Sequence, residues 1–310
     1  WENVKRNEIV VFNQPADTLL DMNDFTPDRN YYKPIDKKTN LVKRCVGIPG
    51  DSLEIRDGFV FINGKKNVLP YRAKLQFSYE GRIKPGKSFS RNIENRLKTY
   101  YDITDGIQKS NTAFKLSAAT YEAAKAFKNH PSVASIQKMT LPEDYADRDM
   151  FPQDAEYPWN MAYFGPIYIP KKGATIEINT SNLPLYKRLI SEYEGNKVYA
   201  KGNQVYINGK VAATYTCKQN YYWMMGDNRN NSIDARRWGF VPENHIVGKP
   251  VFIWMSWNTH GKGLNKIRWD RVFTTVHPDG PRRSYLKYFL FFLLANYGFR
   301  KWRKRRQKAA

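Results

Sequence analysis

Two short segments concentrate the residues that could do chemistry. The first is VKRCVGIPGD at residues 42–51, and the second is MGDNRNNSIDARRWGFVP at residues 225–242. Each combines charged side chains with the glycine, proline and asparagine typical of tight turns. The first also contains a lysine within a β-branched run, a setting in which an amine can act as a base.

Lys43 is the candidate general base. If residues 41–48 form a strand, side chains alternate between its faces, so Leu41, Lys43 and Cys45 share one face. A free lysine amine has a pKa of about 10.4 and is charged near pH 7, but burial lowers that pKa. A neutral lysine can deprotonate a serine hydroxyl. The alternative for a Lys-Arg pair is a solvated sheet edge.

The two segments resemble the most characteristic motifs of bacterial type I signal peptidases, the serine/lysine leader peptidases. In that family a strand Lys-Arg precedes Val-Gly-(Leu/Ile)-Pro-Gly-Asp, and a later Gly-Asp-Asn-Arg-x-x-Ser-x-Asp-x-Arg closes the site. Residues 8–12, EIVVF, resemble a third family motif. The motifs stand in the family order. The long stretch between the first and second segments resembles that of a longer family member with a large insertion.

The resemblance implies a role for each polar residue of the motifs. Lys43 would be the general base, and Ser232 would hydrogen-bond its amine and orient it, whereas the plainer alternative is a turn serine that caps a backbone amide. Asp234 and Arg236 resemble an internal ion pair of the family, for which an ordinary surface pair is the alternative. The expected supporting residues are Arg44, Asp227, Asn228, Arg229, Asp234 and Arg236.

The nucleophile that the resemblance implies is a serine shortly before Glu8. Residues 1–7, WENVKRN, contain no serine. The oxyanion donors of the family come from the same region, so we expect both to lie upstream of residue 1 and the chain alone to be inert. The alternative is a catalytically inactive, membrane-anchored relative that acts as a peptide-binding protein.

The activity implied by the resemblance is removal of signal peptides from exported preproteins by a membrane-bound serine endopeptidase. The expected partners are the signal-peptide region, bound as an added β-strand, the lipid bilayer and, as a further candidate, the secretion translocon. The implied location is the bacterial cytoplasmic (inner) membrane, with the catalytic domain on the outer, periplasmic face. A soluble self-cleaving repressor also uses a serine and a lysine for catalysis. The chain disfavours that class, because it has a C-terminal apolar run and basic tail and no helix-turn-helix signal.

Cofactors and metals are not expected. The histidines, His130, His245, His260 and His277, have no carboxylate partners at ligand spacing. Cys45 and Cys217 are far apart in sequence, and either two buried thiols or a disulfide is compatible with that.

The charge of the chain favours lipid over nucleic acid. Its 51 Lys+Arg against 29 Asp+Glu give +22, but many basic residues cluster after the apolar run 288–299. That order predicts a hydrophobic anchor followed by a cytoplasmic basic tail, whereas a nucleic-acid binder needs basic residues along one groove. A helix of 12 to 16 residues is short for a hydrocarbon core of about 30 Å, so a spanning, an in-plane and a buried helix remain open. Phe252, Trp254, Trp257 and Trp269 resemble an apolar surface that family members press against lipid, whereas core packing is the alternative, favoured for Phe252 and open for Trp257.

The pattern predicts a mainly β fold of coiled antiparallel sheets with an inserted α+β subdomain and a C-terminal membrane-associated helix. Strands are expected at 8–12 and 41–48, and a hairpin at 52–62 turns at Asp57-Gly58. Helices are expected at 118–128, capped by Ser117, and at 183–193, with Asn182 available as cap. The expected domains are a first part of the core at 1–65, an insertion at 66–160, a second part of the core at 161–280 and an anchor with a basic tail at 281–310.

Overall fold

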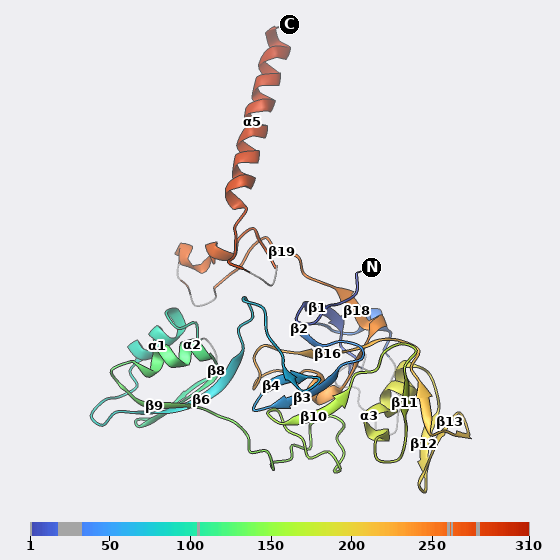
Figure 1. Ribbon diagram of the computed structural model, residues 1–310. Coiled ribbons are helices and arrows are strands. Elements are labelled where there is room, and N and C mark those ends of the chain that lie inside the picture. Colours follow the sequence, from blue (N-terminus) through green and yellow to red (C-terminus); the bar gives the residue numbers. More distant parts are fainter. Residues whose placement is uncertain are drawn as a thin grey trace. The chain divides into compact units, whose positions relative to one another are not determined.

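A computed structural model describes residues 2–17, 33–103, 106–258, 261, 263–276 and 280–309. The chain divides into two compact units. The first consists of Trp1–Leu69 and Ala73–Lys249, and the second of Pro70–Arg72 and Pro250–Ala310. Figure 1 labels the elements of both units.

The first unit is built around a five-stranded antiparallel sheet in the order β17-β16-β2-β1-β18. These strands are β1 (Ile9–Asn13), β2 (Asn40–Gly47), β16 (Tyr221–Met225), β17 (Val241–Pro242) and β18 (Ile246–Gly248). Segments from both sides of the insertion therefore lie side by side, as β2 pairs with β1 on one edge and with β16 on the other. The prediction of one continuous β-core is confirmed.

A second sheet, in the order β10-β3-β4-β5, extends the core. Its strands are β3 (Ser52–Arg56), β4 (Phe59–Ile62), β5 (Lys65–Lys66) and β10 (Phe164–Tyr168). The hairpin turn forms as predicted, with Asp57 and Gly58 at φ +49° and +77°. Gly50, which follows Pro49, has φ +95°, a backbone conformation that glycine adopts readily in a tight turn. Residues of both sheets share one core that includes Phe12, Leu53 and Trp223.

Smaller elements complete this core. They are a 3-10 turn (Ile35–Lys37), the pair β11 (Thr175–Glu177) and β15 (Thr214–Thr216), the sheet of β12 (Val198–Lys201), β13 (Gln204–Ile207) and β14 (Lys210–Val211), and a 3-10 turn (Glu243–His245). The helix predicted at 183–193 is confirmed as α3 (Leu183–Arg188), continued by a π-helical turn (Leu189–Tyr193). Asn182 precedes α3, but its side chain donates to the Glu177 carbonyl instead of capping the helix.

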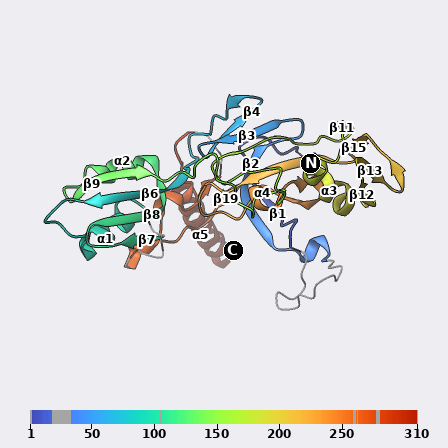
Figure 2. The ribbon, with the colours of Figure 1, turned by 90° about the horizontal axis from the view of Figure 1, so that it is seen from below.

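The insertion has its own sheet and core. Its elements are β6 (Gln76–Ile83), α1 (Arg91–Thr99), β7 (Ile107–Lys109), β8 (Ala113–Thr120), α2 (Tyr121–Lys128) and β9 (Val133–Lys138). The antiparallel order β7-β8-β6-β9 is that of a split β-α-β fold. Both helices lie on one face, where Leu97, Phe114 and Phe127 form a second core (Figure 1, Figure 2). The boundaries at 66 and 160 stay a prediction.

The helix predicted at 118–128 begins later than expected. Residues 113–120 form β8, because Phe114 and Leu116 pack into the core of the insertion and bind this segment to the sheet. Thr120, not Ser117, caps α2 and accepts a hydrogen bond from the Ala123 amide at 3.1 Å. The Ser117 hydroxyl instead donates to the Gly106 carbonyl. Prediction of the cap was therefore wrong, while the end of the helix at Lys128 is correct.

The second unit contains β19 (Phe252–Ile253), β20 (Thr274–Thr275), two 3-10 turns (Gly263–Lys266, Trp269–Arg271) and the helix α5 (Leu286–Ala309). The predicted C-terminal helix is thus present. Across the described residues, the structure has no helix with the length and apolar character needed to cross a membrane. The predicted spanning anchor is not confirmed.

Candidate functional site

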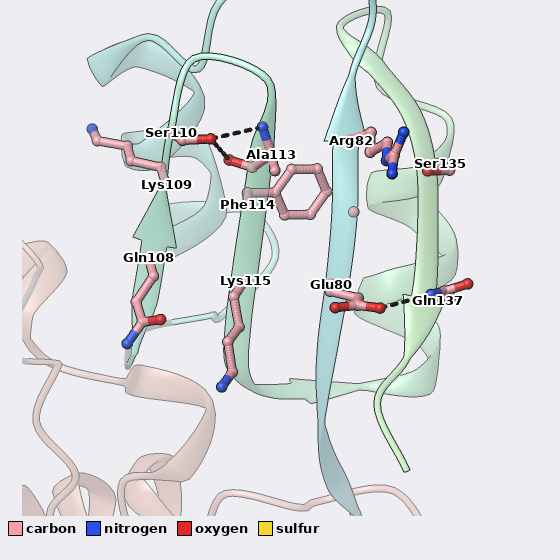
Figure 3. A pocket seen from close by; sticks show the side chains of 11 residues that line it. Glu80, Arg82, Gln108, Lys109, Ser110, Ala113, Phe114, Lys115, Ser135 and Gln137 are labelled. Atoms are coloured by element: carbon pink, nitrogen blue, oxygen red, sulfur yellow. Dashed lines mark hydrogen bonds between the residues drawn. The ribbon is translucent and has the colours of Figure 1, made fainter. Parts of the chain in front are cut away.

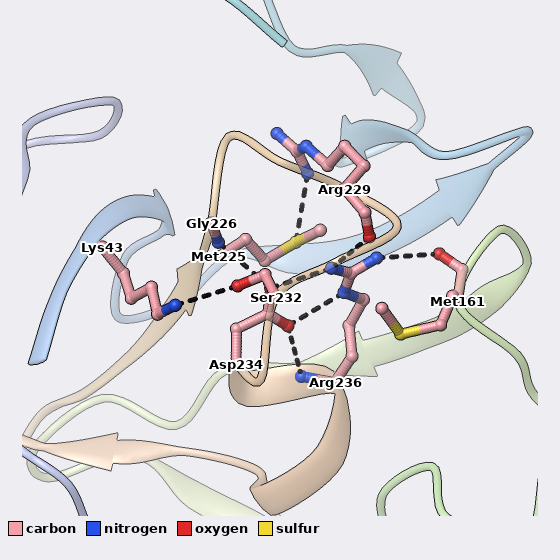
Figure 4. A network of polar contacts seen from close by, with 8 residues as sticks. All are labelled: Lys43, Met161, Met225, Gly226, Arg229, Ser232, Asp234 and Arg236. Atoms are coloured by element: carbon pink, nitrogen blue, oxygen red, sulfur yellow. Dashed lines mark hydrogen bonds and ion pairs between the residues drawn. The ribbon is translucent and has the colours of Figure 1, made fainter. Parts of the chain in front are cut away.

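Lys43 and Ser232 meet although they are far apart in the sequence. Lys43 lies on β2, and Ser232 lies on the loop between β16 and α4 (Ala235–Trp238). The Nζ of Lys43 donates to the Oγ of Ser232 at 2.9 Å, and Figure 4 shows the two side chains pointing toward one another. The contact expected for these two residues is therefore present in the structure.

The surroundings of Lys43 favour a neutral amine. The residue is half-buried, and this burial lowers the pKa of Lys43 below its ordinary value of 10.5. The carboxylate of Asp234 opposes the shift, and the guanidinium of Arg236 adds to it. Desolvation is the largest of these causes, so it decides the direction of the shift.

Gly226 makes room for the contact. A Cβ at this position would overlap the Oγ and Cβ of Ser232 and would lie 3.6 Å from the Nζ of Lys43. The loop can therefore close over Lys43 only when residue 226 has no side chain. Sequence reasoning did not single out Gly226, although its place beside Asp227 in the second motif was a usable signal.

Asp234 and Arg236 form a fully buried ion pair. The Nε and Nη2 of Arg236 donate to the two carboxylate oxygens at 2.9 and 2.8 Å, and both side chains have 0% exposure. Asp234 also accepts from the amides of Gly226 and Arg236. Burial alone would raise the pKa of Asp234, but the charge and hydrogen bonds of Arg236 lower it. The alternative of a surface pair is wrong, and Asp234 caps α4 rather than extending a strand.

Arg236 also ties the loop to its surroundings. Its Nη1 donates to the carbonyl of Met161 at 3.0 Å, and its Nη2 donates to the carbonyl of Arg229 at 2.8 Å (Figure 4). Arg229 is itself buried, and desolvation together with Arg236 lowers the pKa of Arg229 to about 10. Met161, which follows the insertion, was not predicted because it contributes only its main chain.

Arg44 and Asp227 brace the start of the loop. The Nε and Nη2 of Arg44 donate to the carboxylate of Asp227 at 2.8 and 2.6 Å, and Nη1 donates to the carbonyl of Asn7. The Oδ1 of Asn228 is buried without a hydrogen-bond partner among the described residues, and its carbonyl accepts from the Asn231 amide at 3.3 Å. The structure thus brings all the predicted site residues to one loop and the strand beside it.

An open groove borders the Lys43 and Ser232 pair. Its volume is about 450 Å³, and its lining residues are Gln14, Leu41, Lys43, Met161, Asn230, Asn231, Ser232, Ile233 and Arg237. A larger hollow of about 620 Å³ lies on the insertion (Figure 3). There the hydroxyl of Ser110 is held by the main chain of Ala113, so it forms no serine-base pair. The groove beside Lys43 is the candidate active site.

The remaining candidates for chemistry are cysteines and histidines. Cys45 and Cys217 are both free and buried, which resolves the open question of pairing, and burial raises the pKa of both thiols. Among the residues that the structure describes, no three or more His, Cys, Asp and Glu side chains are placed to hold a metal. His260 and His277 lie outside the described residues.

Aromatic side chains are exposed in the second unit. Trp254, Trp257 and Trp269 have 68%, 52% and 52% of their surface exposed. Phe252 is 46% exposed and packs edge-on against Phe273, so its prediction as a core residue is wrong. The reason is that β19 and β20 form a two-stranded sheet, in which pairing joins the strand edges and leaves side chains on the faces uncovered by the sheet itself.

The comparison with known proteins matches segments that contain the site residues. The family model described as signal peptidase, peptidase S26, matches residues 1–113 and 211–257, just over half of the chain. Signal peptidase I of Buchnera aphidicola subsp. Schizaphis graminum is 36% identical over 107 residues, which cover 30% of this chain and 33% of that protein. Signal peptidase I of Haemophilus influenzae is 34% identical over 120 residues, which cover 38% and 31%. The chain thus spans about a third of the length of these curated relatives. It belongs to the signal peptidase family, peptidase S26.

Proposed function

We propose that the full-length protein is a membrane-bound serine endopeptidase that removes signal peptides from exported preproteins. One observation carries the proposal. The amine of Lys43, with a pKa lowered by burial, is hydrogen-bonded to Ser232 at the wall of an open groove. A lowered pKa increases the fraction of the amine that is neutral and can act as a general base.

The proposed reaction proceeds through an acyl-enzyme. A nucleophilic serine attacks the scissile carbonyl while Lys43 accepts its proton. Lys43 then passes that proton to the leaving amine, and the peptide bond breaks. In the second half, Lys43 takes a proton from water, the hydroxide attacks the ester carbonyl, and Lys43 returns the proton to the serine oxygen as the ester bond breaks.

Ser232 and the ion pairs have a supporting role in this proposal. A neutral amine rotates freely unless an acceptor fixes it, and the Oγ of Ser232 is that acceptor at 2.9 Å. Asp234 is fully buried and paired with Arg236, so its carboxylate is held by another cation. A free carboxylate beside Lys43 would instead stabilise the charged amine and remove the base.

The second unit supports a location at the membrane surface. Its exposed tryptophans are amphipathic side chains of the kind that settle at lipid headgroups. The apolar residues of α5, from Tyr288 to Phe299, are also exposed, and a basic segment follows them. We propose the bilayer as partner, with the catalytic unit on the outer face of the bacterial inner membrane and the basic tail on the cytoplasmic face. The translocon remains a further candidate partner.

The test uses the full-length protein and a peptide that spans a signal-sequence cleavage site. Lys43→Ala should abolish turnover, because it removes the proposed general base. Ser232→Ala should lower turnover and leave a residual rate, because it removes the orienting acceptor alone. Val42→Ala, on the exposed side of β2, is the matched control and should retain full turnover.

Two results would contradict the proposal. Retained turnover in Lys43→Ala would exclude this residue as the base. An acyl adduct that mass spectrometry maps to Ser232 would make Ser232 the nucleophile instead of an orienting residue. Peptide binding without cleavage by the wild-type protein would favour the alternative, an inactive relative that binds peptides.

A further inference from the structure

The insertion is joined to the Ser232 loop by main-chain hydrogen bonds. The amide of Gln76, the first residue of β6, donates to the carbonyl of Asp227 at 2.9 Å. The carbonyl of Gln76 accepts from the amide of Arg229 at 2.8 Å, so Gln76 and Asn228 form a parallel β-bridge. The first residue of the insertion's central strand therefore holds three consecutive residues of the loop.

A β-bulge adds a second connection. The pairing of β6 with β8 shifts register between Phe77 and Tyr79, and the amide of Ser78, which lies between them, bonds to the loop instead of to a neighbouring strand. This amide donates to the Oδ1 of Asn230 at 3.1 Å, while the Ser78 hydroxyl donates to the Ser117 carbonyl. Bulges are common next to active sites, and here the strand beside the irregularity contacts the loop through its main chain.

The start of β6 is itself fixed to the catalytic core. The ring of Phe77 packs against Phe59 with centroids 5.4 Å apart, and Lys138 of β9 forms an ion pair with Asp57 at 2.8 Å. A Cβ at Gly58 would overlap the ring of Phe77, so the hairpin and β6 are in close contact. Because β6 is anchored in this way, it can serve as a rigid support for the loop.

We propose that Gln76 is a positioning residue, and that the insertion aligns Ser232 with Lys43 through it. The inference rests on the proposed function, since it assigns to the insertion a part in the same reaction. The buried Asp234 and Arg236 pair fixes the end of the loop, and Gln76 fixes residues 227–229. Ser232 lies between these two supports.

The experiment compares two substitutions at one position in the full-length protein. Gln76→Pro removes the amide that donates to Asp227 and is tolerated sterically at the first residue of a strand. Gln76→Ala keeps this amide and is the matched control, because the side chain of Gln76 makes no hydrogen bond to any residue that the structure describes. Gln76→Pro should lower kcat by about threefold to tenfold with KM unchanged, while Gln76→Ala should match the wild type.

Amide hydrogen exchange of residues 226–232 provides a readout without catalysis. Exchange there should be faster in Gln76→Pro than in Gln76→Ala. Equal kcat and equal exchange in the two variants would overturn the inference. If the wild type cleaves no signal peptide, the proposed function fails while the exchange comparison still decides whether Gln76 orders the loop.

A second variant covers the case in which Gln76→Pro does not fold. Asn230→Ala removes the acceptor of the Ser78 amide, and Asn92→Ala is its control, because Asn92 is an exposed residue of α1 that does not line the groove. Faster exchange and a lower kcat in Asn230→Ala alone support the inference. A raised KM with unchanged kcat and exchange would show a substrate contact instead and would contradict it.

Discussion

The two ends of the Ser232 loop are held by ion pairs that differ in solvent exposure. At the end that leads into α4, Asp234 and Arg236 are both fully buried. At the start, the side chain of Arg44 is 5% exposed but that of Asp227 is 32% exposed. Both pairs have two hydrogen bonds of similar length, so geometry alone does not separate them.

Burial makes the two pairs differ in energy. A buried charge that loses its partner has no water to replace it, whereas a partly exposed charge recovers hydration. The buried pair also receives hydrogen bonds from the Gly226 and Arg236 amides and donates to two carbonyls. Loss of the buried pair should therefore affect the whole loop, and loss of the other pair only its start.

The largest effect is expected from Asp234→Asn. The substitution keeps the size of the side chain but leaves the guanidinium of Arg236 buried without a counter-charge, at a cost of about 3–5 kcal/mol in the free energy of unfolding. Urea unfolding followed by tryptophan fluorescence measures it. Asp149→Asn is the matched control, because Asp149 pairs with Arg237 while 78% exposed, and it should leave the unfolding midpoint unchanged. A similar loss of unfolding free energy in Asp234→Asn and Asp149→Asn would show that burial does not determine how much an ion pair stabilises the protein.

Gly226→Ala should have the next largest effect. The added Cβ overlaps Ser232, so the loop must move away from Lys43, and a shift of about 1 Å can lower turnover by about 100-fold. Turnover by the full-length protein is the measurement. Gly248→Ala, where an added Cβ meets no atom within 4 Å, should retain activity. Unchanged turnover in Gly226→Ala would show that the loop adapts without losing the site.

The sequence was informative where local chemistry decides the structure. The turns at Gly50 and Asp57-Gly58 follow from backbone preferences, and the family motifs located Lys43 and Ser232. It was uninformative where distant packing decides, as for the start of α2, where the core of the insertion draws residues 113–120 into β8. The link from Gln76 to the loop was also hidden, because main-chain hydrogen bonds leave no side-chain signature.

Asp227→Asn tests the partly exposed pair. Arg44 keeps its bond to the Asn7 carbonyl, and water can reach the site of the lost carboxylate charge, so the expected loss is about 1–3 kcal/mol. Chemical unfolding under the conditions used for Asp234→Asn gives the comparison. Asp36→Asn, which removes a 3.9 Å pair between exposed side chains, is the control and should show no change. A loss as large as that of Asp234→Asn would mean that partial exposure does not protect this pair.

The smallest effect concerns pH and separates the two pairs by their influence on Lys43. Turnover should rise with pH as the amine of Lys43 loses its proton, with a midpoint below 10.5, because burial lowers the pKa of Lys43. The Asp234 carboxylate raises that pKa, so Asp234→Asn, assayed where it stays folded, should move the rising limb to lower pH. Asp227 is not among the charges that shift Lys43, and Asp227→Asn should leave the limb in place. Profiles of kcat against pH for the three proteins measure this. A limb that moves to higher pH in Asp234→Asn would show that another group titrates, since removing a negative charge cannot raise the pKa of an amine.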